Sequence, residues 1–145
     1  MRFSANQQDI QTSLNYCQGV IEKRSTLPIL SNVLLNVEKS ELTLTATDLD
    51  LIFIHKIKNI EVIEEGKTTT SSSIMYDIIR KISSGKKINF SNAGSSKLNL
   101  EADKSVFNLN CIDASEFPLT DEDFNQNIFK IDSKSLLKLL NKCKF

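Results

Sequence analysis

The chain is poor in the residues on which catalytic and metal sites depend. Its 145 residues include one histidine, His55, no tryptophan and three widely spaced cysteines, Cys17, Cys111 and Cys143. A zinc site or an activated nucleophile needs partner residues that the sequence does not place nearby, so we expect no enzyme, no metal and no cofactor. Three cysteines without a C-x-x-C pair predict free thiols and a reduced, cytoplasmic setting.

Net charge and long apolar runs are also missing. Lysine plus arginine and aspartate plus glutamate number 18 each, so the formal net charge is zero. A neutral chain has no overall attraction for nucleic acid, and only the placement of its charges could supply one. No run of about 18 apolar residues occurs, and the N-terminus lacks a basic-then-apolar signal pattern. We therefore expect no membrane partner.

Two segments have the apolar spacing of amphipathic helices. The first covers residues 7–19, with Asn6 as N-cap and with Ile10, Leu14 and Cys17 on one face. The second begins in the serine run 71–73. Its apolar positions are Ile74, Met75, Ile78, Ile79 and Ile82.

Around these helices, apolar and polar residues alternate as in half-buried strands. Pro28 has no backbone N–H, and we expect it to open the strand that contains Val33, Leu35 and Val37. A strand, a helix and further strands follow one another twice along the chain. The prediction is an α+β fold of two β-α-β-β-β repeats, with two helices packed on one face of a mainly antiparallel sheet.

A third copy of this repeat begins near the C-terminus. A shift of 126 positions superimposes Asn6 on Asp132, while the apolar positions Ile10, Leu14 and Cys17 fall on Leu136, Leu140 and Cys143. We expect residues 1–124 to form one domain, with an acidic linker at its end. Residues 125–145 would be the first strand and helix of a second domain, so the chain is expected to be a fragment.

Basic residues gather on the predicted helices. Lys134, Lys138 and Lys142 recur every four residues and therefore share one helix face. The second helix and its exit carry Arg80, Lys81, Lys86 and Lys87. This placement favours a helix layer that faces a polyanion. The alternative is an ordinary solvated helix face.

Two smaller features leave alternatives open. The segment 22–26 contains the basic pair Lys23 and Arg24, which could contact phosphate or could belong to a solvated connector. Asp48 and Asp50 lie two apart on a predicted strand and therefore share a face. They could be a pair of functional acids, or ordinary solvated strand residues, which the lack of further ligands favours.

Three ordered motifs narrow the interpretation. They are R-x-T-L-P-I-L-x-N from Arg24, T-x-T-D-L-D from Thr45, and F-x-L-x-x-x-x-A-x-[DE]-F-P from Phe107. Their order and spacing resemble the bacterial replicative sliding clamp family, the beta subunit of DNA polymerase III, over residues 1–145.

The resemblance implies a non-catalytic processivity factor of DNA replication. In that family, three domains per chain and two chains close into a ring around double-stranded DNA, and the polymerase and clamp loader bind through domains that this chain would lack. The present chain would then be the first domain and the start of the second. The rival hypothesis is a truncated interaction module that pairs through an exposed edge strand without encircling DNA.

The resemblance also implies roles for individual residues. The expected DNA-contacting residues are Arg24, Arg80, Lys81, Lys134, Lys138 and Lys142. Where many members have an arginine this chain has Ser73, so that contact is either missing or replaced by Lys81. The expected contacts with the second clamp chain are Ile74, Lys104, Phe107 and Leu109. Ordinary core packing is the alternative for Phe107 and Leu109.

Overall fold

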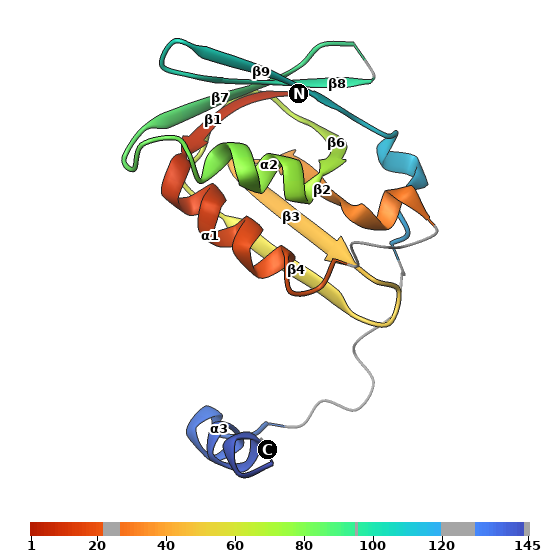
Figure 1. Ribbon diagram of the computed structural model, residues 1–145, viewed down its shortest axis with the longest axis vertical. Helices are drawn as coiled ribbons and strands as arrows, with labels where there is room; N and C mark the ends of the chain where they lie inside the picture. Colours follow the sequence, from red (N-terminus) through yellow and green to blue (C-terminus); the bar gives the residue numbers. More distant parts are fainter. Residues whose placement is uncertain (22–26, 95, 120–129, 144–145) are drawn as a thin grey trace.

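The computed structural model describes residues 1–21, 27–94, 96–119 and 130–143 (Figure 1). Two helices lie in the body of the molecule, α1 (Gln7–Cys17) and α2 (Ser72–Ile79), and a third, α3 (Ser133–Lys142), follows near the C-terminus. The strands are β1 (Arg2–Asn6), β2 (Asn32–Glu38), β3 (Glu41–Thr47), β4 (Ile52–Ile57), β5 (Glu61–Glu64), β6 (Gly66–Ser71), β7 (Lys87–Asn92), β8 (Lys97–Ala102) and β9 (Ser105–Asn110). None of the described helices is long and apolar enough to cross a membrane.

The strands form two antiparallel sheets. One has the order β5-β1-β7-β8-β9 and the other the order β4-β3-β2-β6. The leading strand of each repeat is exchanged, because β1 pairs with β7 of the second repeat while β6 pairs with β2 of the first. This exchange divides the expected sheet into two, and the predicted α+β class with two helices and mainly antiparallel strands is confirmed.

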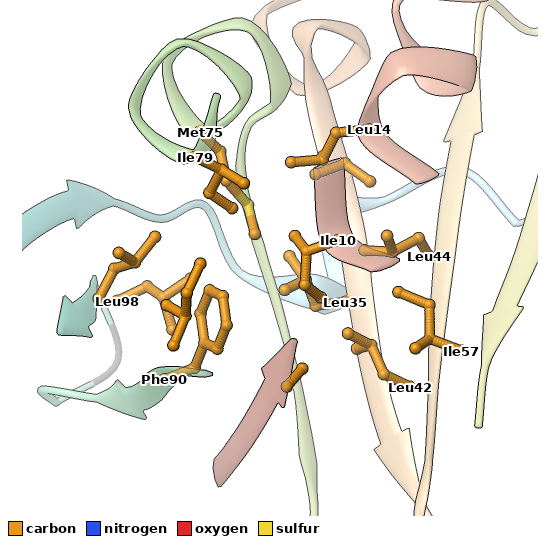
Figure 2. Packing of buried hydrophobic residues seen from close by; sticks show 14 of the residues in the cluster. Ile10, Leu14, Leu35, Leu42, Leu44, Ile57, Met75, Ile79, Phe90 and Leu98 are labelled. Atoms are coloured by element: carbon orange, nitrogen blue, oxygen red, sulfur yellow. The ribbon is translucent and has the colours of Figure 1, made fainter. Parts of the chain in front are cut away.

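The core lies where the two helices meet both sheets. Ile10 and Leu14 of α1 pack beside Met75 and Ile79 of α2, and all four side chains are fully buried (Figure 2). Figure 2 also shows the sheet residues that close the core from both sides: Leu35, Leu42, Leu44, Ile57, Phe90 and Leu98. The predicted apolar face of α1 is therefore confirmed, and the helix ends two residues before the expected position 19.

The Pro28 prediction is wrong. Pro28–Ser31 is a 3₁₀ turn with Pro28 in its first turn, and β2 begins only at Asn32. A missing N–H is harmless at the first position of a helical turn as well as at the start of a strand, so proline fits both. Val33, Leu35 and Val37 are buried as predicted, but the expected alternation is incomplete, because Leu34 on the other face of β2 is also buried.

The third helix begins where the internal repeat predicts. α1 starts at Gln7 and α3 starts at Ser133, a displacement of 126 positions. Asp132 is the N-cap, and its carboxylate accepts a hydrogen bond of 2.9 Å from the Ser135 N–H. Residues 120–129, which include most of the strand predicted before this helix, lie outside the described part of the chain.

Candidate nucleic-acid interface

A shallow polar groove of about 340 Å³ lies between α1 and α2. Its lining contains amides, hydroxyls and aromatic rings but no charged group: Gln7, Gln8, Gln11, Thr12, Asn15, Tyr16, Tyr76 and Ser84. Gln7 is buried, and its amide donates hydrogen bonds to the Ile79 carbonyl at 2.9 Å and to Gln11 Oε1 at 2.7 Å. The bond to Ile79 ties α1 to α2, and the bond to Gln11 orients the Gln7 amide within α1.

Arg80 follows α2 and lies beside this groove. Its guanidinium is 5.9 Å from the centre of the Tyr76 ring, and its Nη2 atom is 3.0 Å from Asp77 Oδ1. The Tyr76 hydroxyl donates a 3.2 Å hydrogen bond to Asn15 Oδ1 of α1, which fixes the ring below the arginine. Half of the Arg80 side chain remains exposed, so an external anion can reach it.

Lys81 lies on the other flank of α2. It lines a hollow of about 390 Å³ between this helix and the β8–β9 hairpin, together with Ile74 and Phe107. The structure therefore separates Lys81 from the groove beside Arg80. Ser73, where the resemblance expects an arginine, lies within 3.4 Å of Gln18.

Lys86 and Lys87 do not add free charge to the helix side. Lys86 pairs with Asp103 at 3.0 Å, and Lys87 of β7 pairs with Glu61 of β5, on the other side of β1. The hydrogen bond from Lys87, helped by one from Ser4, lowers the pKa of the Glu61 carboxyl. Lys86 directly precedes β7 and Lys87 begins it, so the two lysines lie beyond α2, and each is paired with an acid on or beside a strand.

The three lysines of α3 share one face of their helix, as their spacing predicts. Lys134, Lys138 and Lys142 are all exposed, and the remaining faces carry Leu136, Leu137, Leu139 and Leu140, which are also exposed. Arg24 lies outside the described residues.

The hollow on the far flank of α2 is mainly apolar. It takes Ile74, Ile78 and Ile82 from α2 and its exit, and Phe107 from β9. The apolar stripe predicted for this helix is thus divided: Met75 and Ile79 face the core, whereas Ile74 is 54 % exposed. A helix of which two faces are apolar is the sequence signal of a second contact surface.

The other two predicted contact residues lie differently. Leu109 is on the same face of β9 as Phe107, but its side chain is only 5 % exposed, because it packs into the core. We therefore leave it out of the surface formed by Ile74 and Phe107. Lys104 is exposed in the turn between β8 and β9, and Val106, the next apolar residue of this edge strand, is 60 % exposed.

Asp48 and His55 have local structural partners. Asp48 Oδ1 accepts hydrogen bonds from the N–H groups of Asp50 and Leu51, which closes the turn between β3 and β4. Ser13 Oγ donates to the Asp9 carbonyl at 2.8 Å and lies 2.7 Å from His55 Nδ1, within hydrogen-bond distance. Asp48 thus shapes a turn, and His55 joins β4 to α1.

Comparison with known proteins gives one consistent family. A family model described as DNA polymerase III beta subunit, N-terminal domain, matches residues 1–121. The beta sliding clamp of Caulobacter vibrioides is 33 % identical over the whole chain, and that of Escherichia coli K12 is 28 % identical over the whole chain. In both cases the chain spans 39 % of the relative's length.

Solved structures agree with the sequence comparison. A structure described as Caulobacter crescentus pol III beta superimposes with a TM-score of 0.91 at 31 % identity, over 98 % of this chain and 38 % of that one. The DNA polymerase III subunit beta of Pseudomonas aeruginosa also gives a TM-score of 0.91, at 30 % identity, over 97 % of this chain and 38 % of that one.

Proposed function

Because this chain belongs to the family of the DNA polymerase III beta subunit, N-terminal domain, we propose that it is the N-terminal part of a replicative sliding clamp. The whole protein would be a non-catalytic, cytoplasmic processivity factor. Two of its chains would close into a ring around double-stranded DNA and hold the polymerase on its template. Residues 1–124 would be the first domain and residues 125–145 the start of the second.

The observation that carries this proposal is the agreement of the fold with clamp structures along nearly the whole chain. The charges of the helix layer are consistent with the task. A ring that slides must contact phosphates without recognising bases, and each contact must break easily. A groove lined by uncharged polar groups beside a single arginine meets both conditions.

In this proposal Arg80 contacts the DNA backbone from the edge of the α1–α2 groove. The row Lys134, Lys138 and Lys142 would do the same from the second domain, and Arg24 and Lys81 remain proposed contacts. The hollow that contains Ile74 and Phe107, with Lys104 nearby, would bind the second clamp chain. The polymerase and the clamp loader would bind elsewhere in the whole protein.

The DNA-facing assignment can be tested by an NMR titration of the chain with a short DNA duplex at several salt concentrations. We expect weak binding that perturbs residues of the α1–α2 groove. Arg80→Gln should reduce the slope of log affinity against log salt by about 0.9, the value for one phosphate contact. Arg2→Gln is the matched control, because Arg2 lies beside Asn89 and Glu101 on the outer face of its sheet. Equal effects of the two variants would contradict the assignment.

The contact between chains can be tested by native mass spectrometry. Residues 1–145 by themselves should be a monomer, because in the proposed ring the surface that binds Phe107 belongs to the third domain of the other chain. A stable closed homodimer of the chain would contradict the proposed interface. It would favour the rival hypothesis, in which the edge strand β9 pairs with another chain.

A further inference from the structure

Arg80, at the edge of the groove that the proposed function assigns to DNA, forms an ion pair with Asp77, which itself lines the neighbouring hollow that contains Ile74 and Phe107. Nη2 of Arg80 is 3.0 Å from Asp77 Oδ1, and both side chains are exposed, by 51 % and 59 %. A phosphate that approaches Arg80 from the groove must therefore compete with a carboxylate that is already bound. Arg80 is the only described arginine beside this groove.

Neighbouring residues keep the Arg80 guanidinium and the Asp77 carboxylate close to each other. Tyr76 lies one turn before Arg80, and its ring restricts the guanidinium from below. The hydrogen bond from the Tyr76 hydroxyl to Asn15 fixes that ring against α1. Asp77 is on α2, three residues before Arg80, so the carboxylate stays a neighbour of the guanidinium when an anion arrives. Arg80 can turn from one acceptor to the other with little rearrangement.

We infer that Asp77 is a built-in competitor of the DNA backbone for Arg80, an inference that rests on the proposed function. When a phosphate leaves, Arg80 returns to Asp77 and not to bulk water, so the contact costs less to break. When a phosphate binds, the released carboxylate regains its own cations, which cancels part of the counterion release from DNA. Both effects weaken the contact between Arg80 and phosphate, and they do so equally at every position along the duplex.

The inference predicts the behaviour of Asp77→Asn, an uncharged side chain of the same shape. Duplex affinity should rise about two- to fivefold, the range expected when an exposed ion pair is removed from competition. The salt dependence of binding should become steeper, by less than about one unit of log–log slope. The gain should vanish when Arg80 is also changed to Gln, because no arginine then remains to be released.

Asp103→Asn is a matched control. Asp103 also pairs at 3.0 Å, with Lys86, and the two side chains of that pair are exposed by 56 % and 49 %. The substitution Asp103→Asn removes the same charge from a similar ion pair next to the β8–β9 hairpin. It should change the affinity for the duplex less than Asp77→Asn does. Melting curves followed by circular dichroism should show the same folded state for all variants.

The outcomes separate this inference from the proposed function. A gain from Asp77→Asn that persists in the Arg80→Gln background, or that Asp103→Asn matches, would mean a general charge effect and would overturn the inference. So would a loss of affinity with Arg80→Gln but no gain with Asp77→Asn, and in that case the DNA-facing role would stand. If Arg80→Gln leaves binding unchanged, the proposed role of Arg80 fails and the inference fails with it.

Discussion

The helices α1 and α3 occupy equivalent positions in the internal repeat but have different surroundings. In α1, Ile10 and Leu14 are fully buried against both sheets. In α3, the corresponding Leu136 and Leu140 are 39 % and 58 % exposed. The two helices share a starting position and an apolar spacing, so the sequence pattern specifies the face that will pack, while burial depends on the strands that cover it.

The N-terminal caps of the two helices show the reverse order: the exposed helix α3 has the stronger cap. Asp132 caps α3 with its side chain, whereas the Asn6 side chain accepts no backbone N–H of α1 and instead donates to the Asp9 carboxylate at 3.4 Å. A helix that packs on a sheet is stabilised by that packing, whereas an exposed helix depends more on local interactions such as its cap. Three measurements can test this contrast between tertiary and local stabilisation.

The largest expected difference is between two cysteines at the same position of the repeat. Cys17 of α1 is fully buried, and burial raises the pKa of its thiol to about 12, while Cys143 at the end of α3 is exposed. The shift from the ordinary value of 9.0 lowers the reactive thiolate fraction about a thousandfold. Alkylation of the native protein, followed by mass spectrometry, should therefore modify Cys143 and leave Cys17 unmodified.

Denaturant provides the control for this experiment. Both thiols should react in the unfolded chain, and Cys111, whose half-buried thiol also has a raised pKa, should react slowly in the native state. Rapid modification of native Cys17 would show that the packing of α1 opens readily, and the contrast with α3 would be lost.

A second difference is expected for matching leucine truncations. Leu14→Ala leaves a cavity in the core and should lower the free energy of unfolding by about 2–5 kcal/mol. Leu140→Ala, at the equivalent position of α3, removes an exposed side chain and should change it by less than about 0.5 kcal/mol. Urea unfolding of both variants measures the two changes in the free energy of unfolding. Equal losses would indicate that α3 is packed as tightly as α1.

The smallest effect concerns the cap of α3. Hydrogen bonds from the Ser135 N–H and hydroxyl lower the pKa of the Asp132 carboxyl below its ordinary value of 3.8. A lowered pKa in the folded state stabilises the helix above that ordinary value, and the stabilisation is lost as the pH falls through the lowered pKa. The Ser135 amide resonance should therefore shift, and its exchange should quicken, only below about pH 4.

Asp132→Asn is the control for this titration, because asparagine also caps helices but does not ionise in this range. The variant should keep α3 and lose the acid dependence at Ser135. A Ser135 amide that titrates equally in both proteins would show that the carboxylate of Asp132 is not the cap.

Much of the fold could be predicted because its signals are local. Apolar spacing identified α1 and its buried face, and the repeat identified the start of α3. Pro28 was misassigned because a missing N–H suits two structures. The division of the sheet depends on pairing between strands such as β1 and β7, far apart in the chain, which periodicity does not encode.

The candidate site was predicted less completely. The resemblance selected Ile74 and Phe107, which line one hollow, but it also selected Leu109, which is buried in the core. Arg80 and Lys81 are adjacent in sequence and so point to different flanks of α2. The neutral groove was missed, although the i,i+4 spacing of Tyr76 and Arg80, which places the two side chains together at its edge, was visible in the sequence.

The exchange of leading strands between the two repeats has a consequence for how the domain acquires its structure. Since β1 must find β7 and β2 must find β6, neither half can complete a sheet by itself. Pairings between strands so far apart in the sequence make folding slow, on a scale of milliseconds to seconds rather than microseconds. A polypeptide cut between β5 and β6 should therefore remain unfolded, and its two pieces should regain structure only when mixed.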